Sequence, residues 1–264
     1  MTEIAHPSEQ GAAEQPKTDE VALAISGLTF AYPKRDDLFK DFDLQIYSGE
    51  KVGMIGPNGS GKTTLFLLTC GILPAKSGEI GIFGEPMEVG KFSSDIGLVF
   101  QNADDQLFTT CVRDDVAFGP KNMGLKQTEI AERVHQSLAA TGTEDFIERV
   151  PQNLSGGEKG MVAIATVLAM RPRLILYDEP SASLDLRSRR RLIEFLQQSQ
   201  ETLLMSTHDL ELVLEVCDRV LLLDNAAIVA EGKPAEVMGD AELMKTHGLE
   251  KPHALSPHVH FGSD

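Results

Sequence analysis

One stretch of the chain sets the starting point for its fold: Gly56-Pro57-Asn58-Gly59-Ser60-Gly61-Lys62-Thr63-Thr64. It matches the phosphate-binding pattern of a glycine, four residues and then Gly-Lys-Ser/Thr. The apolar run 51–55 before it is typical of a buried strand, and residues 65–70 after it are typical of a helix. Because the motif requires this order of strand, loop and helix, the stretch predicts a loop that binds phosphate groups.

The chemistry of such a loop is anion capture. Glycines let the backbone wrap around a phosphate, so that successive N–H groups point inward. The helix that follows adds the positive end of its dipole. We expect Lys62 to reach the β- and γ-phosphates of a nucleotide, and the hydroxyl of Thr63 to bind Mg²⁺.

Composition limits the partners that the chain can have. Its 264 residues suffice for one large α/β domain or two lobes. A net charge of −16 argues against a nucleic-acid surface and against direct binding to anionic lipid. We find no apolar run that approaches the length of a membrane span and no basic, apolar signal segment at the N-terminus. A cytosolic location is expected, and docking onto a membrane protein is compatible with it.

The pattern of the chain divides it into parts. Residues 1–20 are polar and aperiodic, which predicts a disordered arm. Short strands are expected at 21–26, 43–47, 79–83 and 95–100, followed by a mostly helical lobe from about 102 to 160. Beyond that lobe, strands alternate with helices, which predicts a parallel sheet with both faces covered. A short helix and a tail rich in His and Pro occupy residues 241–264.

Two carboxylates follow the apolar strand expected at 173–177. A buried strand that ends in Asp178 and Glu179 is costly unless the pair is used. Asp178 suits Mg²⁺, and Glu179 suits a general base that deprotonates the water attacking a γ-phosphate. Taken alone, such a pair is more often a turn and a helix cap. Together with the phosphate loop it predicts nucleotide hydrolysis.

A third motif, Leu154-Ser155-Gly156-Gly157-Glu158, opens a predicted helix with Ser155 as its N-cap. Two glycines at a helix start form another anion site, although a flexible helix start is the better interpretation in isolation. In combination, the motifs resemble the ATP-binding subunits of ABC transporters over residues 21–240. Residues 154–158 are similar to the family signature, Gln101 to the Q-loop, Ser183-Leu184-Asp185 to the D-loop, and His208 to the H-loop.

The resemblance implies an α/β fold with a RecA-like P-loop NTPase core, an antiparallel β subdomain and a helical subdomain that carries the signature. It also implies ATP with Mg²⁺ as ligand, catalytic roles for Glu179, His208 and Lys62, and Mg²⁺ contacts from Thr63, Gln101 and Asp178. Tyr32 is similar to the aromatic residue that stacks on adenine. The remaining nucleotide contacts implied are Gly56, Pro57, Asn58, Gly59, Ser60, Gly61, Thr64, Ser155, Gly156, Gly157, Glu158 and Asp185.

Segments 99–108 and 114–120 narrow the resemblance to the ATPases of energy-coupling-factor importers, the cobalt, nickel and vitamin type. This implies a homodimer or a pair with a paralogous ATPase, arranged head to tail, and peripheral attachment to the cytoplasmic face of the cell membrane through integral membrane subunits. Leu107, Phe108 and Phe118 are either docking residues or lobe core. The alternative function is a soluble ABC ATPase that acts on an assembly such as an iron–sulfur scaffold.

Two features depart from the pattern or stay open. Met161 stands where the family usually has an arginine, and we expect it to remove a charge near the γ-phosphate. The tail holds His247, His253, His258 and His260, which either ligate nickel, cobalt or zinc or are incidental in a solvated tail.

Overall fold

The computed structural model describes residues 19–256. Its centre is a six-stranded sheet with the strand order β10-β9-β3-β8-β7-β6, in which only β10 runs antiparallel to its neighbour. Residues 1–18, which cover most of the expected arm, and residues 257–264, which include His258 and His260, lie outside the described part. The strands are β3 (Lys51–Ile55), β6 (Ile96–Val99), β7 (Leu174–Asp178), β8 (Thr202–Ser206), β9 (Arg219–Asp224) and β10 (Ala227–Gly232).

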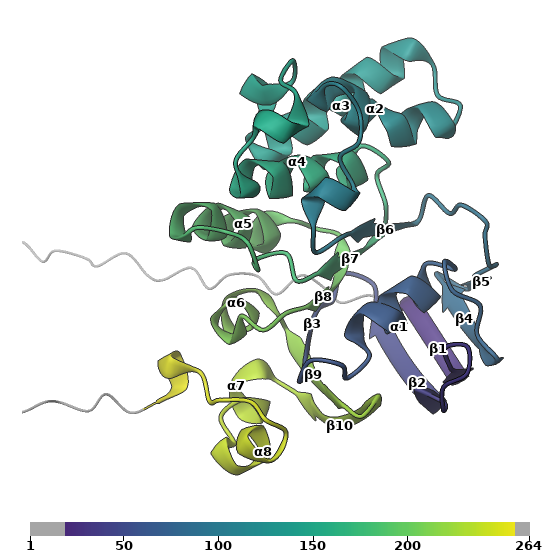
Figure 1. Ribbon diagram of the computed structural model, residues 1–264, viewed down its shortest axis with the longest axis vertical. Helices are drawn as coiled ribbons and strands as arrows, with labels where there is room; N and C mark the ends of the chain where they lie inside the picture. Colours follow the sequence, from purple (N-terminus) through teal and green to yellow (C-terminus); the bar gives the residue numbers. More distant parts are fainter. Residues whose placement is uncertain (1–18, 257–264) are drawn as a thin grey trace, which may run out of the picture.

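The inner strands are apolar because helices cover both faces of this sheet (Figure 1). Every residue of β7 and β8 is buried, as the near-continuous apolar runs of parallel strands predict. One face packs against α1 (Lys62–Thr69). The other face packs against α5 (Leu186–Gln198) and α6 (Leu210–Val216).

An antiparallel sheet with the order β2-β1-β4-β5 lies on the far side of α1 and shares its apolar core (Figure 1). Its strands are β1 (Val21–Phe30), β2 (Phe39–Tyr47), β4 (Ser77–Ile82) and β5 (Glu85–Pro86). The first strand was predicted to stop at residue 26, but it continues through Gly27, which adopts a φ of +59° where the pairing register shifts. This register shift is a β-bulge, and it lets β1 continue beyond Gly27 instead of ending there.

The helical lobe consists of α2 (Val112–Asn122), α3 (Gln127–Thr141) and α4 (Gly156–Leu168). Ile130, Val134 and Leu138 lie four residues apart on one face of α3 and are buried in the core of the lobe, as expected for an amphipathic helix. Short 3₁₀ turns, η1 (Ala103–Asp105), η2 (Glu144–Phe146) and η3 (Pro151–Asn153), connect its helices to each other and to β6.

The C-terminal segment adds α7 (Pro234–Val237), α8 (Ala241–Thr246) and the 3₁₀ turn η4 (His253–Leu255), which lie next to β9 and β10 in Figure 1. His247, one of the tail histidines, makes a 2.8 Å contact from Nδ1 to Asp224 Oδ2. Within residues 19–256 no group of three His, Cys, Asp or Glu residues is arranged to hold a metal ion. No helix of this described part is long and apolar enough to cross a membrane.

The structure places Met161 elsewhere than predicted. Its side chain is 5% exposed and lies in the apolar cluster that joins α4 to β7 and α5, together with Tyr177 and Leu192. A side chain enclosed in this apolar cluster does not face a phosphate. The expectation that Met161 removes a charge near the γ-phosphate was therefore wrong. Its neighbours are apolar, which explains why an apolar residue is suited to the position.

We predict that Met161→Arg destabilises the fold and does not restore a missing function. A guanidinium group forced into this cluster has no partner among apolar neighbours, and an uncompensated buried charge costs about 3–5 kcal/mol. Met161→Leu, which conserves volume, is expected to cost less than about 1.5 kcal/mol. Urea denaturation without nucleotide measures both. Equal unfolding midpoints for the arginine and leucine variants would contradict the burial described here.

Candidate nucleotide site

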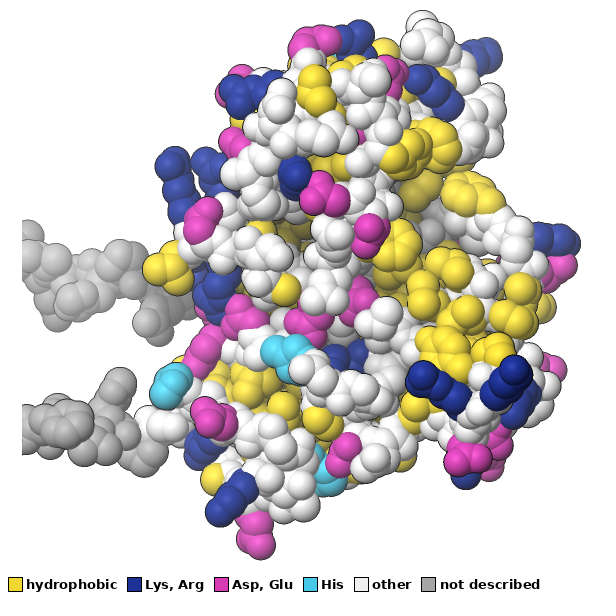
Figure 2. All heavy atoms as spheres, viewed as in Figure 1, with side chains coloured by type: hydrophobic (Ala, Val, Ile, Leu, Met, Phe, Trp, Pro, Cys, Tyr) yellow, Lys and Arg dark blue, Asp and Glu magenta, His cyan; other side chains and the backbone are white. Residues whose placement is uncertain are grey.

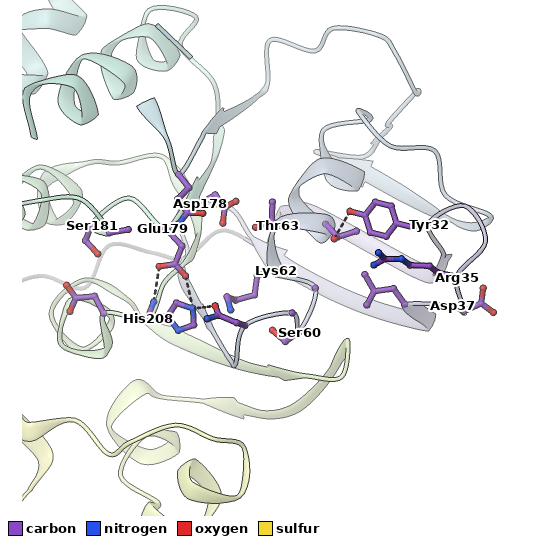
Figure 3. Close-up of a pocket in the computed structure, with 18 of the residues that line it drawn as sticks. Tyr32, Arg35, Asp37, Ser60, Lys62, Thr63, Asp178, Glu179, Ser181 and His208 are labelled. Carbon is purple, nitrogen blue, oxygen red and sulfur yellow. Dashed lines mark hydrogen bonds and ion pairs between the residues drawn. The ribbon is translucent and has the colours of Figure 1, made fainter. Parts of the chain in front are cut away.

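A cleft of about 920 Å³ opens where the carboxyl ends of β3, β7 and β8 meet. In open α/β sheets, ligands bind at this edge. Figure 3 shows Tyr32 on one side of the cleft, Glu179 and His208 on the other, and Lys62 between them. The predicted residues that line it are Tyr32, Asn58, Gly59, Ser60, Gly61, Lys62, Thr63, Thr64, Gln101, Asp178, Glu179 and His208.

The phosphate loop holds its shape through close backbone contacts. Gly56 has a φ of +153°, and a Cβ atom there would lie 1.9 Å from the carbonyl oxygen of Leu223 on β9. Gly61 has a φ of +107° and is the N-cap of α1, so no side chain accepts hydrogen bonds from the first turn of this helix. The first N–H groups of a helix have no partner within it, and here they lie at the cleft. The loop is therefore built to receive an anion.

Lys62 brings a positive charge into this loop. Its ammonium group donates to the carbonyl oxygens of Gly56 at 2.8 Å and Pro57 at 3.1 Å. Burial lowers the pKa of Lys62, and the carboxylates of Glu179 and Asp178 act in the opposite direction. A phosphate oxygen would offer this lysine a charged acceptor, which makes a stronger hydrogen bond than a carbonyl does.

The two carboxylates and the histidine form one connected group. Ser206 donates to Asp178 Oδ1 at 2.6 Å, and the backbone N–H of His208 donates to Glu179 Oε2 at 3.1 Å. The ring nitrogen Nε2 of His208 lies 3.0 Å from Asn58 Oδ1 and 3.3 Å from Glu179 Oε1. His208 thus links the end of β8 to the glutamate after β7 and to the phosphate loop. Glu179 has a φ of +49°, an uncommon backbone conformation for a residue with a side chain.

Two buried side-chain oxygen atoms at the cleft lack a hydrogen-bond partner in the described part of the chain. Ser60 Oγ is buried and forms no hydrogen bond with any residue of the described range 19–256, and the buried Glu179 Oε1 has only its 3.3 Å contact with His208 Nε2. A buried polar atom left unsatisfied costs about 1–3 kcal/mol. Both atoms belong to residues that line the cleft, so a bound ligand or water is positioned to supply the missing partners. The hydroxyl of Thr63 and the carboxylate of Asp178 are oxygen donors of the kind that Mg²⁺ prefers.

Residues 155–158 lie elsewhere. Ser155 caps α4 in a reciprocal pair: its hydroxyl accepts from the N–H of Glu158 at 3.4 Å, and its own N–H donates to Glu158 Oε2 at 2.7 Å. The Ser155 hydroxyl also donates to Glu158 Oε2 at 2.8 Å, and the hydrogen bonds that this carboxylate accepts from the backbone and the hydroxyl of Ser155 lower the pKa of Glu158. In the described structure none of Ser155, Gly156, Gly157 and Glu158 lines the cleft. The structure therefore brings the phosphate loop, Gln101, Asp178, Glu179 and His208 together and leaves this group apart.

Asp185, like the Ser155 group, lies away from the cleft and acts here as a cap. Its carboxylate accepts from the N–H groups of Arg187 and Ser188, both at 2.9 Å, at the start of α5. The backbone and hydroxyl of Ser188 and the N–H of Arg187 lower the pKa of Asp185. Gly56 and Pro57 also do not line the cleft, and they support the loop from behind through the carbonyl oxygens that Lys62 binds.

Sequence reasoning missed part of the lining. Asp209, directly after His208, forms a bidentate ion pair with Arg189 of α5 at 2.5 and 2.8 Å. Its adjacency to His208 was the available signal. The other residues missed are Arg35, Asp36, Asp37, Leu38, Ser181 and Ala182.

Comparison with known proteins gives a consistent result. The family model described as ABC transporter matches residues 39–182. A relative from Synechocystis sp., named as a candidate ABC transporter ATP-binding protein, is 53% identical over 89% of this chain and 82% of its own length. The energy-coupling factor transporter ATP-binding protein EcfA of Methanothermobacter thermautotrophicus is 42% identical over 87% of this chain and 76% of that protein.

A solved structure supports the same assignment. The structure of cbiO1 from Clostridium perfringens, described as part of the ABC transporter complex cbiONQ, has a TM-score of 0.75 and 33% identity to this chain. It covers 86% of this chain and 94% of cbiO1. The predicted α/β fold with an added antiparallel sheet and a helical lobe is thereby confirmed. The chain belongs to the ATP-binding subunits of ABC transporters, which are ATPases.

Proposed function

We propose that this chain powers an importer of the energy-coupling-factor type by hydrolysing ATP between two ATPase chains. The solute that we propose is a metal ion such as cobalt or nickel, or a vitamin. Similarity to EcfA and to cbiO1 supports the importer type. The separation of the Ser155 group from the cleft supports the two-chain part of the proposal, because this helix start could cap a phosphate but does not line the cleft of its own chain.

In this proposal the cleft binds one ATP. Tyr32 stacks on the adenine, and the loop from Gly56 to Thr64 surrounds the phosphates with N–H groups. Lys62 leaves the Gly56 and Pro57 carbonyl oxygens and donates to the β- and γ-phosphates. Thr63, Gln101 and Asp178 hold Mg²⁺, which neutralises charge on the phosphate oxygens when it is bound.

Glu179 is the proposed general base. Its Oε2 atom accepts from the backbone N–H of His208, whereas Oε1 has only a 3.3 Å contact with His208 Nε2, so it can still accept from a water molecule that enters with the nucleotide. Glu179 orients this water and takes its proton as the oxygen attacks the γ-phosphorus, and the bond from this phosphorus to the β,γ-bridging oxygen breaks, so that ADP and inorganic phosphate are formed. His208, held by Asn58, keeps the glutamate in place beside the phosphate loop.

The second chain completes the site. Ser155, Gly156, Gly157 and Glu158 of that chain lie against the γ-phosphate side of the ATP, and Asp185 lies next to the shared surface. The partner is a second copy or a paralogous ATPase. An exposed helix start that faces an anion on another chain gains from its dipole only when the two chains meet.

The membrane partner is proposed to dock on the helical lobe. Phe108 and Phe118 are 61% and 46% exposed, and their rings meet edge to face at 4.9 Å. Leu107, by contrast, is 3% exposed and belongs to the lobe core, which was the other alternative left open for these three residues. Figure 2 shows apolar side chains gathered between this lobe and the antiparallel sheet. Exposed apolar residues also occur in the connection from α1 to β4 and in those that flank β6, namely Ile72, Val89, Phe92 and Phe100.

An apolar face of this kind marks an interaction site. We therefore propose that the chain sits at the cytoplasmic face of the cell membrane through integral membrane subunits. The chain would bind neither bare lipid nor nucleic acid, because its net charge is −16.

We predict that Phe108→Ser combined with Phe118→Ser abolishes co-purification with the membrane subunits while ATP binding persists. Both rings are exposed, so the fold loses little more than their mutual contact, about 0.5–1.5 kcal/mol. Val229→Ser is the matched control, because Val229 is 41% exposed on β10, at the opposite edge of the sheet from β6. Retention of the membrane subunits by the double variant, or their equal loss with Val229→Ser, would refute the docking face.

The composite site predicts complementation between two inactive chains. Lys62→Ala and Ser155→Arg should each lower ATP hydrolysis of the pure variant by about 10²–10³-fold, the usual effect of losing a donor to transition-state charge. Mixing the two variants produces dimers in which both changes fall on one site, so the other site is intact and activity partly returns. If both residues served the same ATP within one chain, mixing would rescue nothing.

Glu179→Gln should bind ATP without cleaving it and elute as a dimer on gel filtration.

A further inference from the structure

The start of α4 lies against the start of α5 with very little space between the two helices, which are neighbours in Figure 1. Gly157, the second residue of α4, is buried, whereas Ser155 and Gly156 before it are exposed. A Cβ atom at Gly157 would lie 2.1 Å from Oγ and 2.6 Å from Cβ of Ser188 on α5. Non-bonded carbon atoms prefer separations of about 3.5–4.0 Å. Position 157 therefore accepts only glycine as long as Ser188 keeps its place.

The backbone conformation gives no reason for a glycine at this position. Gly157 lies inside α4 and has the negative φ of a helical residue, which every amino acid with a side chain can adopt. Glycine is also a much weaker helix former than alanine. The close approach of Ser188 is thus the feature of the chain that requires Gly157 to lack a side chain.

Ser188 is held in place by contacts of the first turn of α5. Its N–H and its hydroxyl both donate to the carboxylate of Asp185, at 2.9 and 3.1 Å. The next residue, Arg189, forms the bidentate ion pair with Asp209. One turn further along α5, Leu192 is fully buried in the core that α5 shares with α4. Rotation of the serine side chain can move its Oγ atom but not its Cβ atom, so α5 cannot easily make room for an added methyl group.

The other two glycines of α4 have more space around them. A Cβ atom at Gly160, three residues after Gly157, would lie 3.5 Å from Leu184 Cδ2, which is an ordinary contact. A Cβ atom at Gly156 would lie 3.3 Å from the carbonyl oxygen of Ser183, which requires only a small adjustment. The tight contact is therefore confined to the pair of Gly157 and Ser188.

We propose that Ser188 is a positioning residue for ATP hydrolysis, because its side chain is the surface against which the first turn of α4 packs and so sets where Ser155 stands. Ser155 and Gly156 are exposed, so this turn is the side of the contact that has room to move. The Ser155 group contacts the γ-phosphate only in the proposed two-chain site. The importance of Ser188 for hydrolysis therefore rests on the proposed function, whereas its packing on Gly157 does not.

A pair of compensating substitutions tests this role in the full chain. Gly157→Ala should lower the kcat of ATP hydrolysis by about 10²-fold, the effect that a displacement of about 1 Å can have. Adding Ser188→Gly removes both atoms that the new methyl group meets and should restore most of the lost rate. Adding Ser188→Ala instead keeps the Cβ atom of position 188 and should restore little. The dissociation constant of ADP, measured by calorimetry, should change by less than about twofold in all three, because neither residue lines the cleft.

Urea denaturation without nucleotide gives a second measurement that does not depend on catalysis. In the chain with Ser188, Gly157→Ala should lower the unfolding midpoint, because the cost of overpacking exceeds the gain in helix propensity. In the Ser188→Gly chain the same substitution should no longer lower the midpoint. Gly160→Ala is the matched control on the same helix. Its methyl group has room, so it should lower neither the midpoint nor kcat.

Failure of Ser188→Gly to rescue Gly157→Ala in either measurement overturns the proposal, and so does an equal rescue by Ser188→Ala or an equal loss in Gly160→Ala. An unchanged kcat in Gly157→Ala, together with an inactive Ser155→Arg chain, would refute the role of Ser188 and leave the two-chain site intact. Failure of Lys62→Ala and Ser155→Arg to complement each other would refute the two-chain site, while the rescue within pure variants could still be measured. The two proposals therefore fail separately.

Discussion

The close approach of Gly56 to the Leu223 carbonyl oxygen is the contact on which the phosphate loop depends. Any side chain at position 56 would collide with the backbone of β9, an inner strand that cannot easily retreat. The turn after β9 adds a second support, because the N–H of Ala226 donates to the carbonyl oxygen of Ser60 at 3.1 Å. Ala226 makes this hydrogen bond in a left-handed backbone conformation, with a φ of +57°. The phosphate loop can direct its N–H groups into the cleft because β9 supports the loop from the opposite side.

This arrangement also explains how one small region tolerates several buried ionisable groups. Lys62 is 7% exposed, Asp178 is 4% exposed and Glu179 is 9% exposed, and none of them would be stable there alone. Each has a fixed partner: carbonyl oxygens for the lysine, Ser206 for the aspartate and the His208 backbone for the glutamate. The groups that remain unsatisfied, Ser60 Oγ and Glu179 Oε1, belong to residues that line the cleft. Binding of a ligand there completes an electrostatic arrangement that the chain has already prepared.

The sequence was most informative where the local rule and the tertiary fold agree. The phosphate loop, the apolar strands β3, β7 and β8 and the Ser155 cap each follow from residues close together in the chain. Helix α2 was not resolved as a separate element, because Gly119 and Pro120 near its end weaken a helical pattern. Met161 was misplaced because its position relative to a motif says nothing about which side of α4 faces α5.

Leu107 and Phe108 show the same limit at its sharpest. They are adjacent apolar residues, yet Leu107 is buried and Phe108 is 61% exposed. What separates them is Asp115, whose Oδ1 accepts from the N–H groups of Phe108 and Thr109 at 3.1 and 3.0 Å and so fixes the local backbone. That contact spans seven residues and cannot be read from a hydrophobic pattern.

The start of α4 shows how the proposed site between two chains can remain stable before the chains meet. A helix N-terminus left bare on a surface attracts any anion, and here Glu158 supplies one from within the chain. Its Oε2 atom takes both the N–H and the hydroxyl of Ser155, at 2.7 and 2.8 Å. A γ-phosphate carries more charge than a carboxylate, so it can compete for the same hydroxyl and the same dipole. In the proposed site the Ser155 hydroxyl would exchange one charged acceptor for another, and the net gain would be smaller than that of a new hydrogen bond. Such an exchange favours a contact between chains that forms when ATP is present and reverses after its hydrolysis.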